Sequence, residues 1–343
     1  MTGLRCACLI FVGLLWAAAA ARAASEKEVI DLYRQAAGAM QPARVALQRL
    51  AGEGDGLAAH FLGRLHLDGK GVRQDETVAV QWFRKSAVLG RADSAHNLGV
   101  IYERSRGTLR DPQEARRWYA IAAERGYARS QSNLGFLLLE GIGGPPDVDR
   151  ARRWIEEAAA QSEPRGEYLL GMLTLQGRAG IAKDAAEALR LLGLAAEGNE
   201  REAQYRIALL HGSGQGVEQS DRLALEWLRK SAAQRLPEAE LLLAAVYSRG
   251  LYGVVRDPKV AAGWLRRSAL QGNVEAQYGL GLAYAEGNGV RKDATEAYGW
   301  MLHAARNGHA RAIEFVNRVQ SRLPKPEAAA PKAADEGREE KRE

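Results

Sequence analysis

Residues 276–308 read AQYGLGLAYAEGNGVRKDATEAYGWMLHAARNG, and this stretch decides the fold because its pattern recurs along the chain. It contains the pair Leu280-Gly281, a glycine-rich turn, Asp293 and Trp300. A pattern that recurs every 36 or 37 residues is typical of stacked helix pairs. Six of the seven tryptophans follow the pattern at spacings of 36 or 37 residues, except for one gap of 73 residues in which Leu191 occupies the missing place: Trp82, Trp118, Trp154, Trp227, Trp264 and Trp300.

Each repeat is expected to contain two helices. The second of them should begin seven residues before the tryptophan position. The residue there is a helix N-cap type, whose side chain accepts a bond from a free backbone N–H and stabilises by about 1 kcal/mol. Glu114, Glu187 and Glu296 follow three residues later, which is the spacing of a capping box. Alanines three residues before and five after the tryptophan place predict that the tryptophans belong to the core. The N-caps are Asp75, Asp111, Asp147, Asp184, Ser220, Asp257 and Asp293.

A first helix is expected upstream of each turn, carrying a Leu-Gly pair or its Ile-Ala or Leu-Ala equivalent. Glycine inside a helix costs about 1 kcal/mol relative to alanine, so its recurrence predicts close contact with a neighbouring element. Only alanine replaces it, in the fifth and sixth units. The pairs stand at 62–63, 98–99, 134–135, 170–171, 207–208, 243–244 and 280–281.

The whole pattern resembles the Sel1-like repeat family, a relative of the tetratricopeptide repeats, over about three quarters of the chain. The resemblance implies an all-α fold: a right-handed α/α superhelical solenoid of about seven helix–turn–helix repeats with capping helices. It also implies scaffold or adaptor work through protein–protein contacts. Disulfide-stapled members of the family differ, because Cys6 and Cys8 are the only cysteines here. We expect the repeats at about 55–90, 91–126, 127–162, 163–199, 200–235, 236–272 and 273–308.

The ends of the chain have other compositions. Residues 1–23 have the layout of a secretory signal peptide, with Arg5, an apolar run and a small-residue cleavage site ending at Ala23; a signal anchor is the alternative. There is no lipobox, so we expect a periplasmic or secreted protein without a membrane span after cleavage. Residues 24–54 read as N-terminal capping helices, with Ser25 and Glu28 spaced as a capping box, 309–323 as a C-terminal capping helix, and 324–343 as a disordered charged tail.

The sequence contains no recognisable catalytic or metal-binding constellation. The six histidines form no HExxH motif, and neither GK[ST] nor G-x-S-x-G occurs. We therefore predict no enzyme activity, no cofactor and no metal. Loss of the signal segment lowers the net charge from +6 to +4, which gives no indication of nucleic-acid binding.

By resemblance to tetratricopeptide arrays, the first helices should line a concave groove. The residues three before and one after the recurrent glycine should point into it. Aromatic side chains there supply contact area and polar ones set register; alternatively, some of these rings pack between adjacent repeats. The predicted groove residues are His60, Arg64, His96, Phe136, Tyr168, Tyr205 and Tyr278.

Two functions are compatible with this groove. The first is a non-enzymatic exported adaptor that binds protein partners of an envelope assembly. The alternative is a glycan-associated factor that aids exopolysaccharide or peptidoglycan machinery by contacting the polymer.

Overall fold

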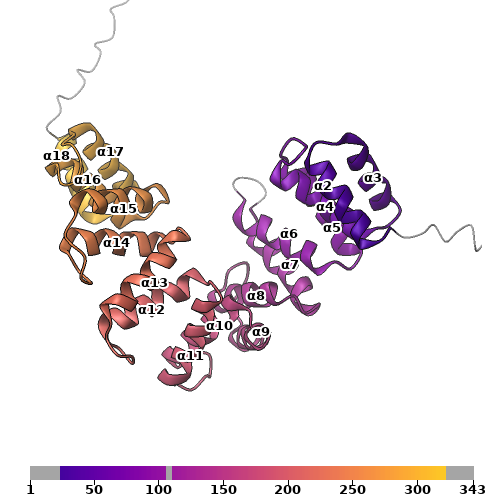
Figure 1. Cartoon of the computed structure of the whole chain (residues 1–343), viewed down its shortest axis with the longest axis horizontal. Helices are drawn as coiled ribbons and strands as arrows, with labels where there is room; N and C mark the ends of the chain where they lie inside the picture. Colours follow the sequence, from indigo (N-terminus) through magenta and orange to yellow (C-terminus); the bar gives the residue numbers. More distant parts are fainter. Residues whose placement is uncertain (1–23, 106–109, 322–343) are drawn as a thin grey trace, which may run out of the picture. The chain divides into compact units, whose positions relative to one another are not determined.

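The computed structural model describes residues 24–105 and 110–321, and this part of the chain contains 17 helices and no strand (Figure 1). The expected signal segment, the charged tail and the last two residues of the expected C-terminal cap lie outside it. The chain divides into two contact units, Met1–Ala203 and Gln204–Glu343. None of the described helices is long and apolar enough to span a membrane. The fold class predicted from the sequence, an α-solenoid of repeated helix pairs, is confirmed.

Two helices precede the repeats and one follows them: α2 (Glu26–Ala37), α3 (Gln41–Gly52) and α18 (Ala310–Gln320). The first helices of the repeats are α4 (Gly56–Asp68), α6 (Ala92–Arg104), α8 (Ala128–Glu140), α10 (Pro164–Gln176), α12 (Arg201–Ser213), α14 (Pro237–Arg249) and α16 (Val274–Glu286). The second helices are α5 (Glu76–Val88), α7 (Pro112–Glu124), α9 (Val148–Ala160), α11 (Ala185–Glu197), α13 (Asp221–Ala233), α15 (Pro258–Leu270) and α17 (Ala294–Arg306).

The predicted N-caps are confirmed at all seven second helices, where each side chain accepts from a backbone N–H of the first turn. The capping box between Ser25 and Glu28 also forms. Glu114 and Glu296 behave differently, because their carboxylates accept from the indole N–H of the tryptophan four residues later, at 3.0 and 3.1 Å. These glutamates therefore orient the tryptophan ring.

The glycine-rich turns meet two separate requirements. The glycine that ends a first helix, such as Gly69 (φ 68°) or Gly287 (φ 77°), has the left-handed conformation that favours glycine. The second glycine of the turn lies against the preceding repeat. A Cβ atom on Gly289 would collide with the carbonyl oxygen of Pro258, at the start of the preceding second helix. The second glycine thus permits stacking between repeats.

The core differs from the sequence-based expectation by one residue. The tryptophans are only half-buried, and the completely buried side chain is the next residue in six of the seven repeats: Phe83, Tyr119, Ile155, Leu192, Leu228 and Met301. This residue occupies the space beside the recurrent glycine; a Cβ on Gly63 would lie 2.8 Å from the Phe83 ring. The tryptophan keeps its polar edge near solvent because its N–H needs a partner. In α13, Lys230 lies 4.0 Å from the centre of the Trp227 ring.

Candidate functional site

The seven predicted groove residues all lie on first helices, and the name inner-face layer is used for this set of residues. Five belong to the unit that ends at Ala203, and Tyr205 and Tyr278 belong to the other unit. In the first unit, Phe136 of α8 and Tyr168 of α10 pack against one apolar cluster with Ile155 at its centre. The two rings therefore contribute to one cluster from consecutive repeats.

His60 does not fit the expectation of an open groove residue, because only 6% of its surface is exposed. Its Nδ1 lies 2.8 Å from the Ser94 hydroxyl, which donates to Ser86, which in turn donates to the carbonyl of Gly56. Since the Ser94 proton is already used, Nδ1 of His60 must be the donor. Burial lowers the pKa of His60 to about 4, so the ring is neutral at pH 7.

His96 repeats this arrangement one unit later. Its Nδ1 lies 2.9 Å from the hydroxyl of Ser130, and its ring contacts those of Tyr119 and Tyr127. Burial lowers its pKa to about 4 as well. Both histidines therefore join one first helix to the next. They match the alternative expectation, in which some of these rings pack between adjacent repeats. A sequence signal existed, because each serine stands two places before the next histidine position.

The remaining members of the inner-face layer are half-buried, and several contact a neighbouring repeat or a capping helix. The Arg64 side chain is 43% exposed, and its guanidinium lies 5.7 Å from the centre of the Tyr33 ring. The Phe136 ring has Arg165 at 5.3 Å, and the Tyr278 ring stacks on His309 with centres 4.1 Å apart. Burial raises the pKa of Tyr205, which stays a neutral phenol at pH 7. The layer thus presents partly exposed rings and guanidinium groups in restrained positions.

A set of buried polar residues at equivalent positions of successive repeats, which we call the polar column, was not predicted from the sequence. Four residues before the recurrent glycine, the third to seventh repeats carry a buried Gln or Glu. Gln131 shows its role: it donates to the Ala123 carbonyl of the preceding second helix and accepts from Gln161 at 2.6 Å. The spacing of 36 or 37 residues inside an apolar helix was the available signal. The column consists of Gln131, Glu167, Gln204, Glu240 and Gln277.

Glu240 is the completely buried carboxylate of this column. It accepts from the Arg267 guanidinium at 2.9 Å and from the Gln271 amide at 2.6 Å. Both partners come from α15, the second helix of the same repeat. Because every oxygen has a donor, this carboxylate is a structural group that joins α14 to α15.

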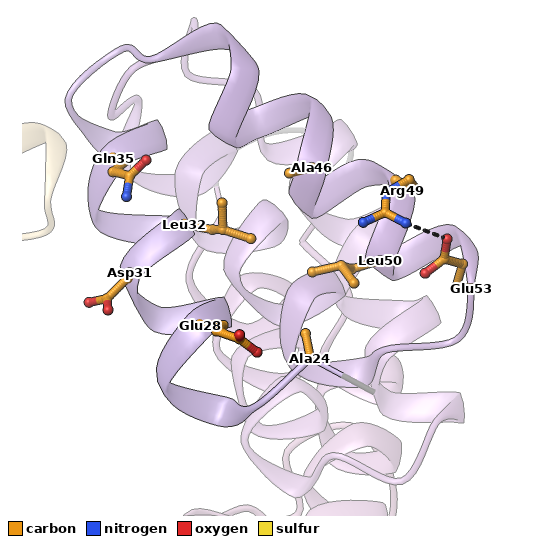
Figure 2. Close-up of a pocket in the computed structure, with 9 residues that line it drawn as sticks. All are labelled: Ala24, Glu28, Asp31, Leu32, Gln35, Ala46, Arg49, Leu50 and Glu53. Atoms are coloured by element: carbon orange, nitrogen blue, oxygen red, sulfur yellow. Dashed lines mark hydrogen bonds and ion pairs between the residues drawn. The ribbon is translucent and has the colours of Figure 1, made fainter. Parts of the chain in front are cut away.

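A cavity of about 650 Å³ lies at the N-terminal cap, between α2 and α3 (Figure 2). Leu32 and Leu50 are its apolar lining residues. Two of its carboxylates have local partners. Glu53 forms an ion pair with Arg49 at 3.0 Å, and Glu28 accepts a hydrogen bond of 2.7 Å from the backbone N–H of Ser25. These polar groups are engaged in helix capping and ion pairing, so this cavity is the solvated end of the array.

Within residues 24–105 and 110–321, no group of three or more histidine, cysteine, aspartate or glutamate side chains could hold a metal ion. The partly exposed side chains of the inner-face layer are aromatic rings and the Arg64 guanidinium, which are suited to non-covalent contacts with a partner.

Comparison with known protein families identifies Sel1 repeats over most of the chain. The chain therefore belongs to the Sel1 repeat family, whose members generally act as protein-interaction scaffolds and whose solenoid fold is typically non-catalytic. The family membership predicted from the sequence is confirmed. The matched stretches are 56–90, 92–127, 128–163, 164–200, 201–236, 237–273 and 274–309.

The solved structures similar to this chain include two proteins with Sel1-like repeats. A Sel1 repeat protein from Oxalobacter formigenes is 28% identical, with a TM-score of 0.58 and coverage of 85% of each chain. A protective antigen present in uropathogenic Escherichia coli strains, which has the Sel1-like repeat fold, is 26% identical, with a TM-score of 0.51 and coverage of 85% of this chain and 72% of that one. No functionally curated protein matches the chain.

Proposed function

We propose that this protein is an exported, non-enzymatic adaptor that binds protein partners of an envelope assembly through its inner-face layer. The observation that carries the proposal is the restraint on Arg64, Phe136 and Tyr168. Each is half-buried and lies on the first helix of its repeat; Arg64 contacts the capping helix α2, and Phe136 and Tyr168 pack against a cluster shared with a neighbouring repeat. Side chains restrained before binding lose less entropy when a partner arrives.

Export rests on the signal-peptide layout of residues 1–23. An envelope partner is then the class of protein that the adaptor would meet after secretion.

The test is in-cell crosslinking of the tagged full chain, followed by affinity capture and mass spectrometry. The variant Arg64→Gln/Tyr168→Leu removes two inner-face groups, and the leucine is the residue that the sixth repeat carries at the same place, Leu241. A matched control, Arg153→Gln/Glu156→Gln, changes two exposed residues of α9. Envelope proteins captured by wild type and control but lost by the variant support the adaptor role.

Equal capture by all three proteins would move the binding surface away from the inner-face layer. If no protein is captured and the chain instead sediments with isolated cell wall, the glycan-associated function replaces the adaptor. Thermal unfolding of each variant, followed by circular dichroism, separates lost binding from lost folding.

A further inference from the structure

The repeats can be compared with one another. The turn of the sixth repeat differs from the other described turns because it carries exposed aliphatic side chains. Val255 is 86% exposed and Leu251 is 40% exposed. In the other described turns, the residue two before the N-cap is Arg73, Pro145, Ala182, Glu218 or Arg291. The equivalents of Leu251 are Lys70, Arg178, Gln215 and Asn288, whereas Ile142 of the third repeat packs against the core.

Val260, at the start of α15, is also 36% exposed. We call Leu251, Val255 and Val260 the turn-6 patch. The exposed part of an aliphatic side chain contributes nothing to the fold, because it stays in contact with water, and this applies most strongly to Val255. Three of them within ten residues of one turn mark an interaction surface more strongly than isolated exposed side chains do.

A cavity of about 670 Å³ adjoins this turn, between Tyr252 and α13. Tyr252 has a φ of 53°, a left-handed conformation that bulky residues rarely adopt. Its hydroxyl lies against Gly212 of α12, where a Cβ would collide with it. The tyrosine is therefore fixed in place, and its ring and Leu225 supply the apolar lining of the cavity.

The rim of the cavity carries three cations and two carboxylates, those of Asp221 and Glu226. Arg222, Arg229 and Lys230 all line it. Glu226 is shared between Arg222 at 3.6 Å and Lys230 at 2.9 Å, while Arg229 donates to the Tyr247 hydroxyl.

The turn adds further positive charge. Arg256 and Lys259 are exposed on either side of the N-cap Asp257, and neither has an ion pair within the described residues. The carboxylate of Asp257 already accepts two backbone N–H groups of α15. Cations therefore outnumber carboxylates around the cavity and the turn, and Arg256 and Lys259 are free to pair with carboxylates that flank an apolar anchor.

We propose that the turn-6 patch and the adjoining cavity form a second binding surface, which takes an acidic segment of a partner protein. An aliphatic or aromatic side chain of that segment contacts Leu251, Val255 and the Tyr252 ring. Its carboxylates face Arg256, Lys259 and the arginines of the cavity rim. This surface shares no residue with the inner-face layer, so different variants test the two surfaces.

The test is binding of the full chain to an array of short peptides that combine acidic and apolar residues in varied spacings. Two companion arrays replace every acid by lysine, or every apolar residue by serine. The variant Leu251→Gln/Val255→Glu carries the residues of the fifth repeat, Gln215 and Glu218, and so should fold normally. Leu270→Glu is the matched control: it has the same change of charge, at a side chain 66% exposed at the other end of α15.

We expect wild type and Leu270→Glu to bind acidic–apolar peptides, and the double variant to bind them at least about tenfold more weakly, in line with the loss of two apolar contacts. Val255→Arg should also bind more weakly despite its added positive charge. Tighter binding by Val255→Arg would overturn the proposal, because charge alone would then explain the affinity. Equal binding of the lysine array, or recruitment only to phosphatidylglycerol vesicles, would overturn it too.

Discussion

Replacing Gly63 by alanine tests the packing that joins the two helices of a repeat. In an exposed helix the change stabilises by roughly 0.5–1 kcal/mol, because alanine has the higher helix propensity. Here the new Cβ would lie 2.8 Å from Cδ1 of Phe83, whereas carbon atoms pack best at about 3.5–4.0 Å. Phe83 is completely buried and cannot turn away.

Relieving this contact requires α4 and α5 to separate or the phenylalanine to leave its rotamer. Overpacking of this kind costs about 1–3 kcal/mol, which exceeds the gain in helix propensity. We therefore expect Gly63→Ala to lower the free energy of unfolding by roughly 1–2 kcal/mol and the unfolding midpoint by a few degrees. Gly193→Ala in α11 is the control: no atom lies within 4 Å of its added Cβ, so the midpoint should rise.

Urea and thermal unfolding followed by far-ultraviolet circular dichroism measure both effects. A second variant strengthens the test, because the fifth repeat naturally combines Ala208 with Leu228. Gly63→Ala/Phe83→Leu should be less destabilised than the sum of its two single variants. The reasoning is refuted if Gly63→Ala stabilises the protein as Gly193→Ala does, or if the double variant shows no coupling.

Three further predictions concern other contacts. The pKa of His60 is about 4 in the folded protein, below its ordinary value of 6.5, so its contribution to stability is complete above pH 6.5 and is lost as the pH falls toward 4. The loss is about 3 kcal/mol at most. His60→Asn should therefore reduce the pH dependence of the free energy of unfolding across this window, and an unchanged slope would contradict the prediction. Gly289→Ala should destabilise more than Gly253→Ala in thermal melts, since both have positive φ but only the first meets a backbone carbonyl. Arg267→Ala should cost about 3–5 kcal/mol by leaving the Glu240 carboxylate buried without its cation, whereas Glu240→Gln should cost far less in the same urea titration.

Local signals made most of the fold predictable. The N-caps, the turn glycines and the recurrent helical glycine each depend on residues within one unit, and all appear at constant spacing. The burial of Phe83 instead of Trp82 in the core was not predictable in this way. One residue turns a helix by about 100°, and apolar residues occupy both positions. Which of the two is buried depends on where the neighbouring helix lies.

The candidate site was harder to predict because its contacts join different repeats. A histidine at position 60 resembles a groove residue until Ser94 and Ser86 are seen to bind it. The same holds for Gln131, whose partners lie in two second helices. Sequence periodicity identifies such positions, but the pairing that buries them is non-local.

A repeat protein nevertheless provides its own reference for separating structural from functional residues. A departure from the repeat pattern that is matched by a partner elsewhere serves the fold: His60 has Ser94, and Ala208 has Leu228. Val255 departs from the pattern without a compensating contact and leaves 86% of its surface in water. This exposure at a departure from the repeat pattern is the observation that leads to the proposed second binding surface.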